Sequence, residues 1–150
     1  MTQTPISLAI GADHRGFLHK EYLLKCTHTL DKNMSFVWHD VGSFDHNRSD
    51  YPAFAHAALK LVQEGVASYA VLLCGTGIGM AIAANRLSHV YAGVVWREDV
   101  ARKAREDDNV NVLVIPADYV SVEVMQACFL AWVTATFKGG RYEDRLQQID

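Results

Sequence analysis

The stretch YAVLLCGTGIGMAIAAN, residues 69–85, decides the fold of this chain. It begins with a short apolar run that is typical of a strand buried on both faces, passes through Cys74 into a glycine-rich turn, and continues into an alanine-rich segment with helical character. Gly75, Gly77 and Gly79 permit backbone angles that other residues avoid and let the main chain approach a ligand closely. A strand, a turn and a helix without a spacer are typical of a parallel α/β sheet.

The rest of the chain repeats this alternation of apolar strand-like runs and helical stretches, without an internal repeat or a low-complexity linker. The expected strands are residues 7–11, 36–41, 69–74, 90–95 and 112–115. The expected helices are residues 16–30, 52–65, 77–86, 98–106 and 120–137, with a shorter one after Gly140. The pattern predicts one domain over residues 1–150, a Rossmann-like three-layer α/β/α fold with a five-stranded parallel sheet.

Composition excludes several classes of function. The 150 residues are 50% hydrophobic and carry a formal charge of -3, and they contain no basic run of the kind that binds nucleic acid or an anionic membrane surface. No apolar stretch has transmembrane length, and the polar start lacks the pattern of a signal peptide, so we expect a cytoplasmic protein. Cys26, Cys74 and Cys128 are widely spaced, which suits reduced thiols better than disulfides or a metal cluster.

Cys74 stands at the carboxyl end of a predicted strand, where ligands bind in sheets of this kind. The helix expected after it would present unpaired N–H groups and the positive end of its dipole, which attract a phosphate, a carboxylate or a developing oxyanion. The same field favours a thiolate. The alternative is a buried strand-end cysteine whose neighbouring glycines serve only packing.

Polar residues follow other predicted strands or lie near the end of the chain, and each of them can have either a functional or a structural role. Asp13 and His14 follow the first strand as an acid and a base, or as a helix cap and a surface imidazole. Tyr51 follows a polar loop and either orients a sugar hydroxyl or packs before the second helix. Arg141 and Arg145 would lie on one face of the last helix, where they suit a phosphate or pair with neighbouring acids.

Together and in this order, the motifs resemble the ribose-5-phosphate isomerase B family, which includes the two subunits of galactose-6-phosphate isomerase. The matching pieces are IGADHRGF, RSDYP, LLCGTGIGMAIAAN, NVNVL and GGRYEDR. The resemblance implies an aldose–ketose isomerase of the ribose 5-phosphate/ribulose 5-phosphate type, in pentose phosphate metabolism. It implies a homodimer or a dimer of dimers with shared active sites, no metal and no organic cofactor.

The resemblance also implies residue roles in a cis-enediolate mechanism. Cys74 would be the base that moves a proton between C2 and C1, and Thr76 with the loop amides would stabilise charge on the substrate oxygens. Asp13 and Tyr51 would hold hydroxyls. Some groups would come from the partner subunit. The positions with an implied substrate-binding role are Asp13, His14, Tyr51, Gly75, Gly77, Gly79, Asp108, Arg141 and Arg145.

Two departures from the family pattern lie close together. Family members usually have histidine and asparagine at the positions of Asp107 and Asp108, and that histidine opens the furanose ring. After the fifth strand the family typically has glycine, a small residue and a phosphate-binding arginine, whereas this chain has Pro116, Ala117 and Asp118. The site has therefore lost one positive charge and gained negative ones.

Several hypotheses account for these departures. Asp107 replaces the histidine as a catalytic group if burial or like charge raises its pKa, or it belongs to an exposed acidic turn. His46 is a second candidate for ring opening. A tetrose phosphate needs no ring opening at all, and a hexose phosphate is a further changed substrate. A related but non-identical subunit would supply missing groups in trans, and a non-catalytic subunit or sensor would only bind the sugar phosphate.

Overall fold

The computed structural model describes residues 3–150, in which each strand is followed by a helix and all strands pair in parallel. The spatial order of the sheet is β2-β1-β3-β5-β4. Its strands are β1 (Ile6–Ala12), β2 (Phe36–Asp40), β3 (Tyr69–Cys74), β4 (Ala92–Val94) and β5 (Val112–Pro116). The helices are α1 (Phe17–Leu30), α2 (Tyr51–Gln63), α3 (Ile78–Ala84), α4 (Glu98–Asp108), α5 (Val122–Thr134) and α6 (Arg141–Gln147).

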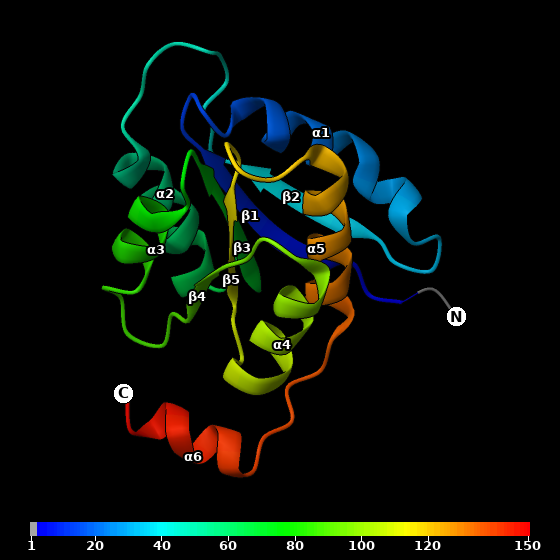
Figure 1. Cartoon of the computed structure of the whole chain (residues 1–150), viewed down its shortest axis with the longest axis vertical. Helices are drawn as coiled ribbons and strands as arrows, with labels where there is room; N and C mark the ends of the chain where they lie inside the picture. The colour runs from blue at the N-terminus through cyan, green and yellow to red at the C-terminus, as the bar shows by residue number, and fades with distance from the viewer. Residues whose placement is uncertain (1–2) are drawn as a thin grey trace.

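Helices cover both faces of the sheet, so the predicted three-layer α/β/α fold is confirmed (Figure 1). Alternate residues of the central strands point to opposite layers: Leu8 and Ile10 of β1 pack with α1 and α5, whereas Ala9 packs with α2. The α2 face is rich in alanine, which lets that helix approach the sheet closely. By the same alternation Cys74, the last residue of β3, lies on the α2 and α3 side.

The direction of chain winding reverses between β1 and β3, the two central strands. Ala12 pairs with Leu73, and the amide of Asp13 donates to the carbonyl of Leu73 at 3.2 Å. The turn after β1 and the end of β3 therefore lie side by side at the carboxyl edge. This is the switch point at which open α/β sheets bind ligands.

The strand β4 is shorter than the predicted residues 90–95. It lies at the edge of the sheet and pairs only with β5. The side-chain amide of Asn85 accepts from the Ala92 N–H at 2.8 Å and donates to the Ala92 carbonyl at 2.9 Å. Side chains thus replace strand pairing where β4 begins, which the apolar pattern of this stretch could not reveal.

Several helix ends also differ from the prediction, and two of them have a clear cause in the backbone. Helix α4 continues to Asp108, two residues beyond the expected end, and stops at Asn109 in a left-handed conformation with φ of 50°. Asp107 and Asp108 therefore form the last turn of a helix rather than a loop. Helix α5 ends at Thr134 instead of residue 137, because Ala135 is extended.

The apolar helix α5 packs into the hydrophobic core of the chain. Phe129 contacts Phe36 and Trp38 in an aromatic cluster, and Trp132 donates to the Val110 carbonyl at 2.8 Å. This internal packing accounts for the hydrophobicity of the helix. Within residues 3–150, no helix is both long enough and apolar enough to cross a membrane.

One charged side chain is completely buried between α1 and β2. The Lys20 ammonium is 2.7 Å from a carboxylate oxygen of Asp40 and 3.0 Å from one of Glu21, and it lies over the rings of Phe17 and Phe44. A buried charge is tolerated when it is paired and hydrogen-bonded in this way. The pair therefore fixes α1 against the edge of the sheet.

We expect Lys20→Ala to lower the free energy of unfolding by about 2–4 kcal/mol, because it leaves a cavity and an unpaired Asp40. Lys20→Met, which fills the space, should cost less. Lys60, 3.8 Å from Glu64 in an exposed pair, is the matched control, and Lys60→Ala should change stability by less than about 1 kcal/mol. Urea unfolding measures all three, and equal losses at positions 20 and 60 would contradict this account.

Candidate active site

The thiol of Cys74 is buried at the carboxyl end of β3, with only 4% of the residue exposed. Its Sγ accepts a hydrogen bond from the amide of Gly77 at 3.2 Å. The Thr76 hydroxyl accepts from the Ile78 amide at 3.2 Å, in the turn that leads into α3. The sequence CGTGIG therefore folds into a tight turn that brings the Gly77 N–H to the sulfur.

Glycine is needed at each of the three positions in the turn for a different physical reason. Gly77 has a φ of 76°, which favours glycine. At position 79, a Cβ would lie 2.6 Å from the ring of Tyr51, so this glycine leaves room for the aromatic side chain. At position 75, a Cβ would lie 2.7 Å from both Arg15 and Asp118. The glycines thus shape the backbone and bring three side chains against the loop.

A cavity of about 400 Å³ opens at this loop. It joins the ends of β1, β3 and β5 with the start of α2, as expected for a switch-point site. The predicted residues that line it are Asp13, Tyr51, Cys74, Gly75, Thr76 and Gly79. Arg15, Asp118 and Tyr119 complete the lining, and none of these three was assigned a site role from the sequence. Gly77 lies beneath the loop, where a Cβ would meet Val94 and Val114.

Backbone groups hold both Asp13, which lines this cavity, and His14, which is not among its lining residues. One carboxylate oxygen of Asp13 accepts from the amides of Arg15 at 2.9 Å and Gly16 at 3.1 Å. These bonds close the turn that precedes α1, whose N-cap residue is Gly16 without a side-chain cap, so Asp13 is not the helix cap offered as the alternative. The second carboxylate oxygen remains for a ligand. His14 Nδ1 accepts from the Ser49 amide at 3.3 Å, so a neutral ring carries its proton on Nε2. That N–H is a donor suited to an anion.

His46, the second candidate for ring opening, packs away from this lining. Its ring contacts Phe17 edge-on, with 4.6 Å between the ring centroids. It is not among the side chains that line the Cys74 cavity. This contact supports a packing role for His46 within the subunit.

The two predicted arginines, Arg141 and Arg145, lie in a second cluster at the opposite end of the chain's fold. We call Lys138, Arg141, Tyr142 and Arg145 the cationic cluster; its three cations lie 5.1, 5.2 and 5.4 Å from the centroid of the Tyr142 ring. Figure 1 shows α6 at the bottom of the molecule and the turns after β1 and β5 at the top. The structure of the single chain therefore does not bring Arg141 or Arg145 to Cys74.

Asp107 belongs to this distant end as well. Its carboxylate is 2.7 Å from the Lys138 ammonium, and this hydrogen bond lowers the pKa of Asp107 below its ordinary value. The hypothesis that burial or like charge raises this pKa is therefore wrong for the subunit. A carboxyl group with a lowered pKa stays ionised at neutral pH and is a poor proton donor.

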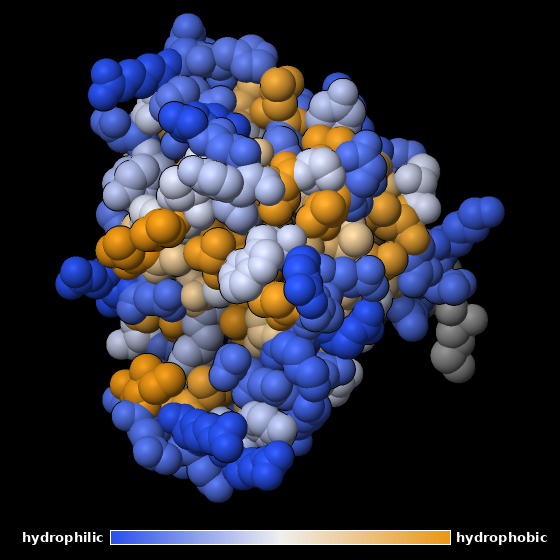
Figure 2. Space-filling model, viewed as in Figure 1, coloured by the Kyte–Doolittle hydropathy of each residue, from blue (hydrophilic) through white to orange (hydrophobic). Residues whose placement is uncertain are grey.

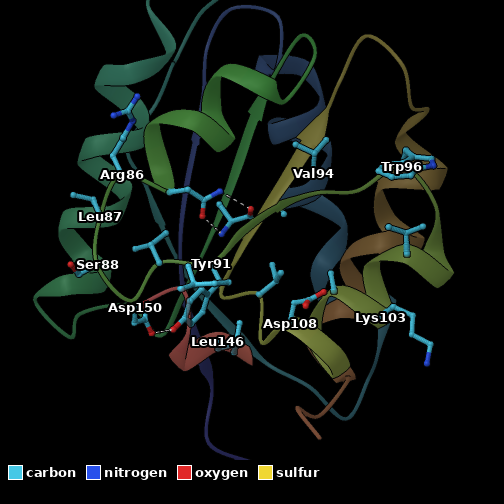
Figure 3. A pocket seen from close by; sticks show the side chains of 18 residues that line it. Arg86, Leu87, Ser88, Tyr91, Val94, Trp96, Lys103, Asp108, Leu146 and Asp150 are labelled. Carbon is cyan, nitrogen blue, oxygen red and sulfur yellow. Dashed lines mark hydrogen bonds between the residues drawn. The ribbon is translucent and has the colours of Figure 1, made fainter. Parts of the chain in front are cut away.

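Asp108 lines a different and larger cavity of about 750 Å³, between β4, α4 and α6 (Figure 3). About half of the lining residues are aliphatic, Leu87 and Leu146 among them, and a hydrogen bond joins Tyr91 to Asp150 (Figure 3). This bond raises the pKa of Tyr91 to about 12. The smaller cavity is the better candidate for chemistry, because a thiol, a buried acid and glycine amides converge there.

Comparison with known proteins places the chain in one family over nearly its whole length. Residues 8–149 match the family model described as Ribose/Galactose Isomerase. The chain is 31% identical over 142 residues to ribose-5-phosphate isomerase B of Escherichia coli, covering 95% of this chain and 93% of that protein. It is 33% identical over 144 residues to a probable ribose-5-phosphate isomerase B of Mycoplasma genitalium, covering 95% and 93%.

Solved structures agree with the sequence comparison. A ribose 5-phosphate isomerase from Thermotoga maritima superposes with a TM-score of 0.89 at 34% identity, covering 97% of each chain. The ribose-5-phosphate isomerase B of Mycoplasma genitalium, solved with bound ribulose-5-phosphate, gives a TM-score of 0.87 at 30% identity over 98% of this chain and 95% of that one. The similarity covers both the sheet and the helices around it.

The loop geometry predicts that two glycines with similar backbone angles lose different amounts of stability when they are replaced by alanine. Gly65 has a φ of 74° with nothing within 4 Å of an added Cβ, whereas at Gly77 the Cβ would lie 3.1 Å from Val94. We expect Gly65→Ala to cost about 1–2 kcal/mol in stability from φ alone. Gly77→Ala should cost about 1 kcal/mol more and also speed alkylation of Cys74, because the loop must shift. Urea unfolding and thiol labelling measure both effects; identical behaviour of the variants would contradict the assigned geometry.

Proposed function

The chain belongs to the ribose/galactose isomerase family, and from this premise we propose that it is an aldose–ketose isomerase that acts on a sugar phosphate with Cys74 as the base. The observation that carries the proposal is the position of Cys74: its sulfur accepts an amide hydrogen bond in a cavity that Asp13 and Tyr51 also line. A thiol needed only for packing has no reason to share a polar cavity with these groups.

The proposed reaction passes through a cis-enediolate. The Cys74 thiolate removes the C2 proton of the open-chain aldose, the C–H electron pair forms the C1–C2 double bond, and the carbonyl oxygen O1 becomes an oxyanion. The thiol then returns the proton to C1, while the O2 proton moves to O1 and C2 becomes the carbonyl. The Thr76 hydroxyl and loop amides would stabilise the negative charge, a contribution typically worth about 100- to 1000-fold in rate for one donor.

The phosphate of the substrate is proposed to meet the cationic cluster of a partner subunit. In one subunit this cluster lies at the opposite end from Cys74, so one substrate cannot reach both groups there (Figure 1). An exposed apolar surface supports association of two copies. Ile78 and Ile82 of α3 are 60% and 55% exposed, and Figure 2 shows hydrophobic side chains gathered over this helix. A homodimer with shared active sites follows from this proposal.

The ion pair of Asp107 favours an open-chain substrate. Lys138 keeps this carboxyl ionised, so it is unsuited to protonate a ring oxygen. Among phosphorylated aldoses, a tetrose 4-phosphate has no furanose to open, because the oxygen that would close the ring carries the phosphate. The second candidate function is therefore isomerisation of a tetrose phosphate instead of ribose 5-phosphate.

Proton exchange tests the proposed base and the substrate together. The chain is incubated in D2O with erythrose 4-phosphate, ribose 5-phosphate or galactose 6-phosphate, and NMR follows deuterium next to the carbonyl. We expect exchange and ketose formation with one sugar, and a loss of about 10²–10⁴-fold in Cys74→Ala. Binding without exchange for every sugar would favour a sensor or a non-catalytic subunit. Exchange that survives in Cys74→Ala would exclude the thiol as base.

Complementation tests the shared site. Cys74→Ala and Arg141→Ala should each be nearly inactive alone, because each lacks one half of every site. Unfolded together and refolded at equal amounts, they should recover about a quarter of wild-type activity, since half of the dimers are mixed and each mixed dimer has one intact site. A mixture of Cys74→Ala with Cys74→Ser is the control. No recovery in the first mixture would indicate that both groups serve the same subunit's site or different roles.

A further inference from the structure

An ion pair closes one wall of the Cys74 cavity. Arg15 follows β1 and Asp118 follows β5, and an Nη of Arg15 donates to a carboxylate oxygen of Asp118. Both side chains lie directly over Gly75, where an added Cβ would be 2.7 Å from each. The pair therefore covers the residue next to the proposed base.

Backbone hydrogen bonds hold both partners to the site. The amide of Asp118 donates to the carbonyl of Gly75 at 3.0 Å, and the amide of Arg15 donates to a carboxylate oxygen of Asp13 at 2.9 Å. Each partner is thus anchored to a residue that lines the cavity. Their side chains are 59% and 30% exposed, so the pair lies at the cavity mouth, in contact with solvent.

The pair gives this wall no net charge. Asp13 already places a buried carboxylate in the cavity, and an unpaired Asp118 would add a second negative charge beside it. An unpaired Arg15 would instead offer a guanidinium fork, the group that holds a phosphate through two parallel hydrogen bonds. When it is paired, Arg15 keeps N–H donors for a neutral oxygen, and Asp118 keeps an acceptor for a hydroxyl.

We propose that the Arg15–Asp118 pair determines specificity at this cavity, because its neutral wall accepts the hydroxyl-bearing end of a substrate and disfavours a phosphate there. The identity of that substrate as a sugar phosphate rests on the proposed function. The charge of the wall does not depend on the proposed function, since it follows from the position of the pair over Gly75. The phosphate is then left to the cationic cluster.

Alkylation of Cys74 by two reagents of similar size and different charge measures this wall directly. Iodoacetamide is neutral and iodoacetate is an anion, so the ratio of their rates at the Cys74 peptide, followed by mass spectrometry, reports the local charge. We expect Asp118→Asn to raise the iodoacetate-to-iodoacetamide ratio and Arg15→Gln to lower it, each by about three- to tenfold. The double variant should return near the wild-type ratio, and high salt should shrink both changes.

Lys60→Gln and Glu64→Gln make the same charge changes in an exposed pair at the far end of α2, and they should leave the ratio unchanged. Ratios that do not move in opposite directions would overturn the inference and leave the pair a purely structural role. Turnover is not needed, so a chain without isomerase activity can still support the inference, whereas failed proton exchange overturns only the proposed function.

A second measurement covers the case in which alkylation is slow because the thiol is buried. Inorganic phosphate is titrated while NMR follows the amide signals of residues 75–79. Phosphate should bind at least about threefold more tightly to Asp118→Asn than to the wild type, because Arg15 is then free to hold it. It should bind more weakly to Arg15→Gln. Equal affinities in all three proteins would overturn the inference.

Discussion

The contact between the turn after β1 and the end of β3 is the constraint on which the rest of the site depends. At Gly16 this contact leaves no room for a side chain, because a Cβ would lie 2.5 Å from the Leu73 carbonyl oxygen. That closeness places Asp13 beside Cys74, and it follows from parallel pairing of two strands whose helices leave toward opposite faces. A site of this kind is therefore a product of sheet topology, and the loop residues refine it.

Much of the fold was predictable, because buried strands and glycine turns leave local signals. The strand that ends at Cys74 was predicted with its observed bounds, and its turn was identified from the glycines alone. The length of β4 was missed, since it depends on the side chain of Asn85 from outside the strand, and the end of α5 was missed because the backbone becomes extended at Ala135 inside an apolar run. The pair of Arg15 with Asp118 spans 103 positions of sequence, and no local pattern indicates such a contact.

Charge is divided unevenly between the two ends of the subunit. The Cys74 cavity contains two carboxylates and one guanidinium that is already paired, whereas the cationic cluster gathers three cations around the Tyr142 ring. The ring partly offsets the repulsion between those cations by contact with its π face. The departures seen in the sequence fit this division: Asp107 pairs with Lys138, and Asp118 pairs with Arg15. Within residues 3–150, these two replacement carboxylates, unlike Asp108, each have a cationic partner.

The side chain of Asn85 has a consequence for the behaviour of the protein at high concentration. An exposed strand edge is a template on which other chains can add strands, the first step toward aggregation. At the start of β4, Asn85 exchanges two hydrogen bonds with Ala92, as the backbone of another strand would. The Asn85 side chain thereby occupies the backbone groups of Ala92 to which another strand would hydrogen-bond. Asn85, the last residue of the stretch that contains Cys74, thus also protects the sheet from growing beyond one molecule.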